Sequence, residues 1–283
     1  METNTLKAII NIKQQGIYNL NEIYPPRSEI NESNQIQNVG TALEYFVKDA
    51  YCNSFTEINK LNEYRKYLSY LGSANNPPDL MIRGGDAIEV KKRSNFSGDI
   101  QLNSSLPKAK LYSDDSRIQH ACVDAEDWDE KDFIYSIGSV IEKKLKLLFF
   151  IYGDCYCANR EIYLNFQKTV EDAVDSIEGN EPSNELGRFN GIDPLGISNL
   201  RIRGMWIIKH PLKVFREHIS FNMNEQEFSL ICIMKKSKFE SFNENDRNII
   251  LNDKEISYKE IKIADPNNPI KFIDAVLIRY DAK

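Results

Sequence analysis

The sequence has no hydrophobic run long enough to cross a lipid bilayer. Its longest apolar run, Leu147 to Tyr152, has six residues, whereas a transmembrane helix needs about 20. The first residues, METNTLKAIINIKQQG, also lack the apolar block and the small-residue cleavage site of a signal peptide. We therefore expect a cytoplasmic protein with no membrane partner.

Cysteine and histidine patterns typical of metal or redox sites are also missing. The five cysteines are an odd number and form no CxxC pair, which argues against a disulfide framework and a zinc ribbon. His120, His210 and His218 form no HxE or HExxH string, which argues against a zinc-dependent or histidine-driven site. No Walker A string occurs, so the chain has no sequence pattern for ATP-driven movement.

The chain has no net positive charge, since 42 Asp and Glu outnumber 36 Lys and Arg and the net charge is −6, but its charges are unevenly distributed. Residues 123–137 carry six acidic side chains and one basic side chain, whereas residues 197–218 carry five basic side chains and one acidic one. An acidic protein can still present one basic face to phosphates. The charge pattern is therefore compatible with nucleic-acid binding.

The order of the predicted elements indicates an α/β fold with a mixed β-sheet flanked by helices. Residues 1–35 are polar and are interrupted by Pro25-Pro26, so we expect an N-terminal helical or irregular arm, followed by one domain over residues 36–283. We expect strands at residues 80–82, 87–91, 133–137, 147–152, 201–208, 228–234 and 275–280. Residues 180–198 are expected to form a long polar loop.

Two segments have apolar residues at helical spacing. In the first, Thr41 and Glu44 fit a capping box at the start of the helix. Its apolar positions are Val39, Leu43, Phe46, Val47 and Ala50. The second helix is expected to begin near Glu161 and to end at Gly179. Its apolar positions are Ile162, Phe166, Val170, Val174 and Ile177.

The strongest candidate site lies in the predicted hairpin from Pro77 to Lys91. Alternation along the second strand places Glu89 and Lys91 on one face. With a turn at residues 83–86, Ile82 pairs near Ala87, and Asp79 then lies opposite Val90. The two carboxylates and the ammonium therefore converge at one sheet edge, which we expect to be exposed to solvent.

Oxygen ligands of this kind suit Mg²⁺, which binds through one or two carboxylates and keeps several waters. We expect Asp79, Glu89 and the backbone carbonyl of Val90 to hold the metal. The metal would polarise a phosphodiester and activate a water molecule. Lys91 would orient or deprotonate that water, or stabilise the developing charge. The alternative is an ordinary hairpin with charges on its solvated face.

The spacing of Pro78-Asp79 and Glu89-Val90-Lys91 resembles the PD-(D/E)XK nuclease superfamily. The strings NPPDLMIRGGDAIEVKK, IQLNSSLPKAKL, FFIYGDCYCA and DPLGISNLRIRGMW are similar to the NgoPII family of type II restriction endonucleases. This resemblance implies a restriction-endonuclease-like core and double-strand cleavage of DNA within a short palindrome, GGCC for the family, leaving a 5′-phosphate and a 3′-hydroxyl. It also implies a functional partnership with a cognate DNA methyltransferase.

Other residues have competing interpretations. Glu44 could be an accessory acid of the metal site or part of the capping box. Lys92 and Arg93 extend the basic edge towards the DNA backbone. A further group offers donors for phosphates or forms a polar loop: Asn103, Ser104, Ser105 and Lys108.

Arg201 and Arg203 share a face if they lie on a strand, and they could bind guanine, clamp phosphates, or pair with the acidic stretch. Asp193 could accept from cytosine N4 or form a turn with Pro194. Because a palindromic target mirrors a two-fold axis, we expect a homodimer on double-stranded DNA. The rival functions are a repair or structure-specific nuclease and a non-enzymatic DNA-binding protein.

Overall fold

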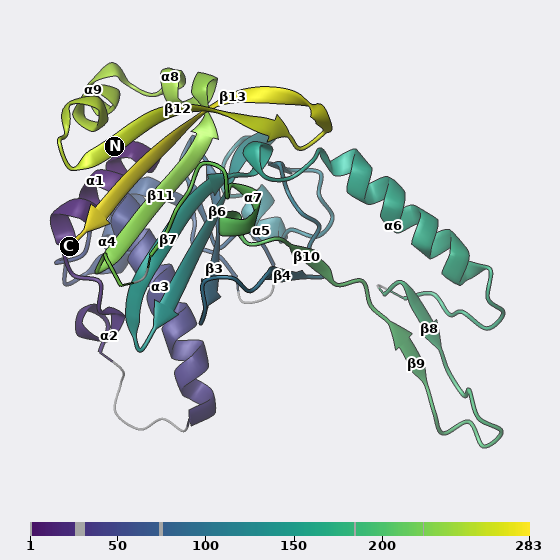
Figure 1. Ribbon diagram of the computed structural model, residues 1–283. Helices are drawn as coiled ribbons and strands as arrows, with labels where there is room; N and C mark the ends of the chain where they lie inside the picture. The colour runs from purple at the N-terminus through teal and green to yellow at the C-terminus, as the bar shows by residue number, and fades with distance from the viewer. Residues whose placement is uncertain (1, 26–31, 74–75, 184, 223) are drawn as a thin grey trace.

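A mixed β-sheet forms the centre of the protein in the computed structural model (Figure 1), which describes residues 2–25, 32–73, 76–183, 185–222 and 224–283. Within these residues nine strands join in one sheet, and β5 (Lys110–Tyr112) pairs with β6. The other strands, in spatial order, are β1 (Leu68–Tyr70), β2 (Leu80–Ile82), β3 (Ala87–Arg93), β6 (Glu130–Ile141), β7 (Lys144–Tyr152), β11 (Phe228–Lys235), β13 (Asn268–Ala282) and β12 (Ile256–Asp265). The expected mixed α/β fold is confirmed.

The central strands are buried because they are almost continuously apolar. β3 pairs in parallel with β6, β6 pairs antiparallel with β7, and β7 pairs in parallel with β11. The expected strands at residues 133–137, 147–152, 228–234 and 275–280 are confirmed within β6, β7, β11 and β13. The edge strand β12 was not predicted, because charged and apolar residues mix along it without a clear period.

The long helix α3 (Glu32–Cys52) lies beside the sheet and buries its apolar stripe from Leu43 onwards in the core, whereas the side chain of Val39 lies outside the described residues. Leu43, Phe46, Val47 and Ala50 are fully buried. The prediction of a capping box at the helix start is wrong, since α3 begins nine residues before Thr41 and both box residues lie inside the helix. The helix therefore continues through the mostly polar residues 32–40, and the local capping pattern at Thr41 does not set where it begins.

The chain ends are joined to the same body. α1 (Thr5–Gln15) buries Leu6, Ile9 and Ile12 in the common hydrophobic core, and Lys13 Nζ forms an ion pair with Asp253 Oδ2 at 2.6 Å. The division of the chain after residue 35 stays a prediction, although α1 packs as part of the core. The remaining helices are α2 (Leu20–Ile23), α4 (Lys60–Tyr67), α5 (His120–Val123), η1 (Gly153–Cys155), α7 (Pro211–Val214), α8 (Lys236–Ser241) and α9 (Glu244–Asn252).

A separate module projects from the sheet (Figure 1). It consists of α6 (Arg160–Asp175) and a hairpin of β8 (Gly187–Phe189) and β9 (Leu200–Ile202). The loop expected at residues 180–198 therefore contains a strand. The expected strand at 201–208 is divided into two strands. β9 ends at Ile202 in the hairpin, and β10 (Trp206–Ile208) pairs instead with β4 (Ile100–Asn103).

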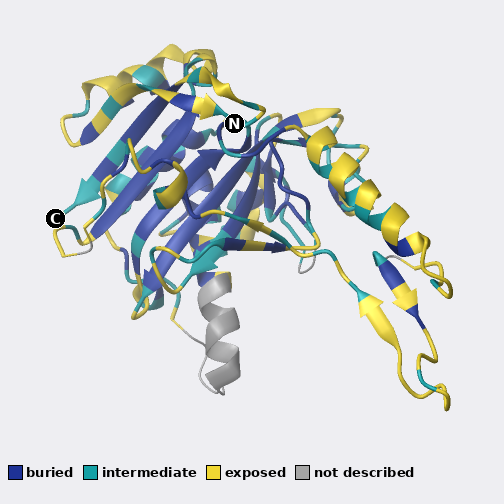
Figure 2. Ribbon diagram, turned by 45° about the vertical axis from the view of Figure 1, so that its right-hand side comes forward, coloured by how far each residue is buried: buried dark blue, intermediate teal, exposed yellow. Residues whose placement is uncertain are grey.

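The apolar stripe of α6 is largely open to solvent, as the yellow residues in Figure 2 indicate. Phe166 is 64% exposed, and of the α6 residues only Val174 is buried. Apolar periodicity predicts the helix, but it does not tell which surface the stripe faces. None of the helices in the described parts of the chain is long and apolar enough to span a membrane.

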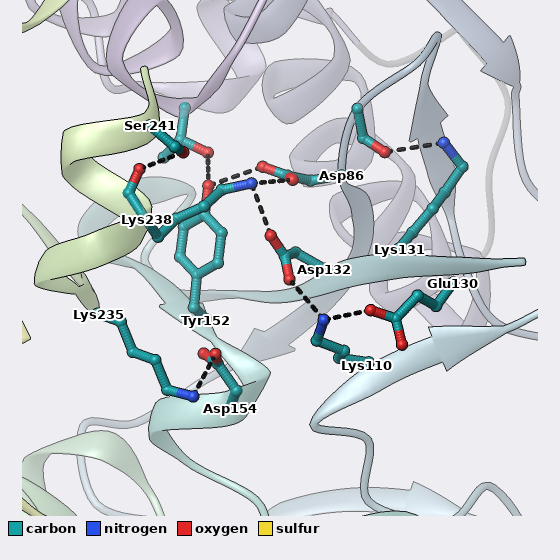
Figure 3. Close-up of polar contacts among 12 residues, drawn as sticks. Asp86, Lys110, Glu130, Lys131, Asp132, Tyr152, Asp154, Lys235, Lys238 and Ser241 are labelled. Carbon is teal, nitrogen blue, oxygen red and sulfur yellow. Dashed lines mark hydrogen bonds and ion pairs between the residues drawn. The ribbon is translucent and has the colours of Figure 1, made fainter. Parts of the chain in front are cut away.

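A charge network fixes the start of β3 to the C-terminal part of the chain (Figure 3). The Lys238 ammonium lies 2.7 Å from Asp86 Oδ1 and 2.7 Å from Asp132 Oδ2. The hydroxyl of Tyr152 donates to Asp86 Oδ2 at 2.7 Å. Since Asp86 is buried, this pairing compensates the cost of removing its charge from water.

Candidate active site

Asp79, Glu89 and Lys91 meet where the β2–β3 hairpin opens. Lys91 Nζ donates to Glu89 Oε1 at 2.5 Å, and the Val90 backbone N–H donates to Asp79 Oδ2 at 2.6 Å. The hairpin register is one residue away from the expectation, because Met81 rather than Ile82 pairs with Ala87. Asp79 directly precedes β2, and its carboxylate accepts the backbone N–H of Val90. The Asp79 side chain therefore lies beside the segment between Glu89 and Lys91.

The expectation of a solvent-exposed edge is wrong for this site. β3 lies between β2 and β6, and Glu89 is only 7% exposed. Gly72 packs directly against the backbone of Asp79, where an added Cβ would lie 2.2 Å from the Asp79 carbonyl oxygen. Only glycine permits this close approach, so Gly72 is a supporting residue that the motif search missed.

Burial, together with crowding of like charges, dominates the electrostatics of the site. Burial, followed by the neighbouring Glu89 carboxylate, raises the pKa of Asp79 well above its usual range. Burial opposes the charged form of Lys91, but the Glu89 carboxylate beside it outweighs this effect and raises the pKa of Lys91. The site therefore has more negative charge than its one ammonium compensates.

Glu44 belongs to the same electrostatic cluster. Burial is the main cause that raises the pKa of Glu44, and the charges of Glu89 and Lys91 act on it in opposite directions. Its place inside α3 removes the capping role that competed with an active-site role. The Val90 N–H points towards Asp79, and in a strand the N–H and C=O of one residue face the same neighbour, so the Val90 carbonyl also faces Asp79.

The donor set fits a small hard cation. Glu89 Oε2 is buried and has no hydrogen-bond partner in the described part of the chain, and such an atom is costly unless a ligand binds it. Among the described residues no three His, Cys, Asp or Glu side chains are grouped closely enough to hold a metal by themselves. Two carboxylates and a carbonyl, completed by water, match the preference of Mg²⁺.

A cleft of about 930 Å³ lies where the projecting module meets β10 and the loop that follows β4. Asn76, three residues before Asp79, contributes to its wall. Arg201 and Arg203 both line the cleft, together with Ser104 and Ser105. Both arginines pair with Glu185, so the described contacts do not include a pairing with the acidic stretch at 123–137.

The remaining predicted DNA contacts are distributed unevenly. Lys92 and Arg93 follow Lys91 on β3, and burial lowers the pKa of Lys92. Asn103 ends β4 and is exposed. Lys108 is only 7% exposed and is paired with Asp115, so its location disfavours a direct phosphate contact.

Asp193 lies in the loop between β8 and β9. It accepts the Leu195 N–H at 3.0 Å and the Ser198 N–H at 2.6 Å, and its hydrogen bonds with Ser198 lower the pKa of Asp193 to about 2. These contacts favour the turn interpretation, in which the Asp193 carboxylate stabilises the loop, over the interpretation in which it accepts a hydrogen bond from cytosine N4.

Two comparisons identify the relatives of this chain. The sequence pattern of the NgoPII restriction endonuclease family matches residues 3–264. The type II restriction enzyme NgoPII of Neisseria gonorrhoeae is 42% identical over 282 residues, which cover 98% of this chain and 99% of that protein. The chain belongs to the NgoPII restriction endonuclease family. This membership assigns it to the restriction endonucleases, which are site-specific deoxyribonucleases.

No solved structure matches the chain. The matched range includes the β2–β3 hairpin, the cleft and the projecting module, so the family pattern covers every site residue described above. It ends inside β12, before β13 begins.

Several cleft residues escaped the sequence analysis of this family member. Arg117 Nη2 donates to Gln167 Oε1 at 2.5 Å, and Arg117 Nη1 is buried without a partner in the described chain. Glu185 joins the two candidate recognition arginines. These residues come from separate loops and from α6, so no short motif connects them, and only the fold brings them to one cleft.

Proposed function

We propose that the protein is a Mg²⁺-dependent type II restriction endonuclease that cuts both strands of DNA within a short palindrome, GGCC, leaving 5′-phosphate and 3′-hydroxyl ends. Its relationship to NgoPII supports the reaction class. A cognate DNA methyltransferase that protects the same sequence would be its functional partner.

The observation that carries this proposal is the unpartnered Glu89 Oε2 next to the Asp79 carboxylate. A buried carboxylate oxygen without a hydrogen bond and a neighbouring acid with a raised pKa both favour the binding of a cation. Asp79, Glu89 and the Val90 carbonyl would hold Mg²⁺. The metal would supply Lewis-acid polarisation of the phosphodiester and a more acidic water molecule.

Side chains of the protein would orient the attacking water and stabilise the charge that develops on the phosphate. Lys91, held by Glu89 Oε1, places an ammonium beside the carboxylates, where it can orient the attacking water and stabilise negative charge on the phosphate. Glu44 extends the acidic side of the pocket from α3. Asp79 also organises the strand, because its Oδ2 accepts the Val90 N–H.

DNA would lie along the cleft where the projecting module meets β10 and the loop that follows β4. Arg201 and Arg203 would face bases, while Lys92, Arg93, Asn103, Ser104 and Ser105 would contact the backbone. One chain contributes one catalytic hairpin, so two chains related by a two-fold axis would cut the two strands of a palindrome.

Digestion of a plasmid of known sequence tests this proposal directly. With Mg²⁺, we expect discrete fragments whose sequenced ends all lie within GGCC, and no cutting with EDTA. Asp79→Asn is the matched control, since it keeps the size of the side chain. Ends scattered over the plasmid, or cutting only at junctions or lesions, would favour a repair nuclease. Sedimentation with a cognate duplex would test the dimer.

A further inference from the structure

Glu185 connects the two arginines that the proposed function assigns to base recognition. Arg201 Nε donates to Glu185 Oε2 at 2.6 Å, and Arg203 Nε donates to the other oxygen, Oε1. The Glu185 side chain is only 12% exposed, whereas the two arginines are 57% and 61% exposed. The carboxylate is therefore covered by the two guanidinium groups, which present their outer parts to the cleft.

The contact uses a particular donor of each arginine. A guanidinium carries five N–H donors in a rigid plane. When the Nε–H is bound, the terminal amino groups remain, and in the described part of the chain those of Arg201 and Arg203 make no hydrogen bond. Guanine O6 and N7 accept two parallel N–H bonds from one guanidinium, so these amino groups offer the donors that this recognition needs.

The backbone holds Glu185 in place independently of DNA. Gly187 pairs with Ile202 in the β8–β9 hairpin, so antiparallel pairing places Glu185 across from the residues that follow Arg203. Arg201 lies in β9 and Arg203 directly after its end, and both side chains project to the side on which they contact Glu185. One carboxylate thus fixes the orientation of two neighbouring guanidinium planes before DNA binds, which lowers the entropy lost on recognition.

We propose that Glu185 is a positioning residue for sequence specificity: it orients Arg201 and Arg203 so that each presents its terminal amino groups to one of two adjacent guanines. This inference rests on the proposed function, because it requires a target with neighbouring G·C pairs. A carboxylate in a DNA cleft also repels phosphates, so Glu185 lowers the affinity for all sequences while raising the preference for the cognate one.

The change in DNA affinity caused by Glu185→Gln separates positioning of the arginines from simple repulsion of phosphates. Positioning predicts a weaker affinity for the cognate duplex, whereas repulsion alone predicts a stronger affinity. We would measure competition binding with Ca²⁺ in place of Mg²⁺, using a GGCC duplex and duplexes with one G·C pair replaced. Glu181→Gln is the matched control, because Glu181 lies in the same module, bonds Asn190 rather than an arginine, and loses the same charge. Circular dichroism would check that each variant is folded.

Positioning predicts that Glu185→Gln loses roughly tenfold or more in cognate affinity, the size of one lost bidentate contact, while its affinity for the replaced duplexes is unchanged or higher. Glu185→Asp keeps the charge but is too short to reach both Nε atoms, and we expect it to lose cognate preference too. If Glu185→Gln instead strengthens cognate and replaced duplexes equally, as Glu181→Gln should, the positioning role is refuted.

Variants of the two arginines distinguish a failure of the positioning role of Glu185 from a failure of base recognition by Arg201 and Arg203. Arg201→Ala and Arg203→Ala should each lose cognate preference if they read guanine, whatever Glu185 does. If both lose affinity for all duplexes in parallel, they contact phosphates, and the recognition part of the proposed function is wrong. If they lose preference and Glu185→Gln does not, the arginines read bases without help from Glu185.

Discussion

Replacing Asp79 in two ways separates its catalytic role from its structural one. Asp79→Ala removes the carboxylate and also the acceptor of the Val90 N–H, whereas Asp79→Asn keeps an oxygen at that position. Both changes remove a negative charge that we assign to the metal site. We therefore expect both variants to lose Mg²⁺-dependent cleavage and to bind cognate DNA, but to differ in stability.

The magnitude follows from the lost hydrogen bond. Leaving a buried backbone N–H without a partner costs about 1–3 kcal/mol, and 1 kcal/mol shifts Tm by about 2–4 °C in a domain of this size class. Asp79→Ala should therefore melt about 2–12 °C below the wild type in EDTA. Asp79→Asn should melt at or above the wild-type temperature, because it also removes repulsion from Glu89 and Glu44.

Differential scanning calorimetry in EDTA and plasmid cleavage in Mg²⁺ together give the answer. Wild-type cleavage rates in either variant would show that Asp79 is not part of the metal site. Equal melting temperatures for the Ala and Asn variants would contradict the Val90 contact, even if both variants were inactive.

Three further outcomes are expected. Because the pKa of Asp79 is raised in the fold, protonation of Asp79 stabilises the metal-free protein at low pH, and this contribution is lost as the pH rises from about 4 through the raised pKa. Calorimetry in EDTA should therefore show the Tm of the wild type falling relative to that of Asp79→Asn over this pH range. Over the same range the affinity for Mg²⁺ should rise by up to roughly tenfold per pH unit for each proton displaced, and an affinity that does not change with pH would contradict this. Affinity for cognate duplex should fall steeply between low and moderate salt, because phosphate contacts release counterions, and a salt-independent affinity measured by fluorescence anisotropy would contradict phosphate binding. Lys238→Ala leaves the buried Asp86 carboxylate without its cation, so denaturant unfolding should show a loss of about 3 kcal/mol, and no loss would show that the network does not stabilise the fold.

The β2–β3 hairpin could be predicted from sequence because its pattern is local. The turn at residues 83–86 and the alternation of Glu89 and Lys91 depend on neighbours only a few residues away. The register was wrong by one residue, since turn length alone does not specify pairing. Burial of the site could not be predicted either, because β6 joins β3 from more than 40 residues away.

The projecting module shows where local patterns are insufficient. The apolar stripe of α6 correctly predicted a helix, but the same stripe would suit a helix packed in the core. Its exposure follows from the position of the whole module, which projects from the sheet (Figure 2). Glu185 was not considered in the sequence analysis, since its role depends on the β8–β9 pairing that brings it beside Arg203.

The link between Asp86 and Lys238 also bears on how the protein is made. The two residues lie 152 positions apart, and a ribosome that adds about 5–20 residues per second needs roughly 8–30 s to cover that distance. During this interval the nascent chain already contains Asp79, Glu89 and Lys91, but the start of their strand has no cation to compensate Asp86. The charge network that fixes the start of β3 is therefore completed only after Lys238 has been added, late in synthesis.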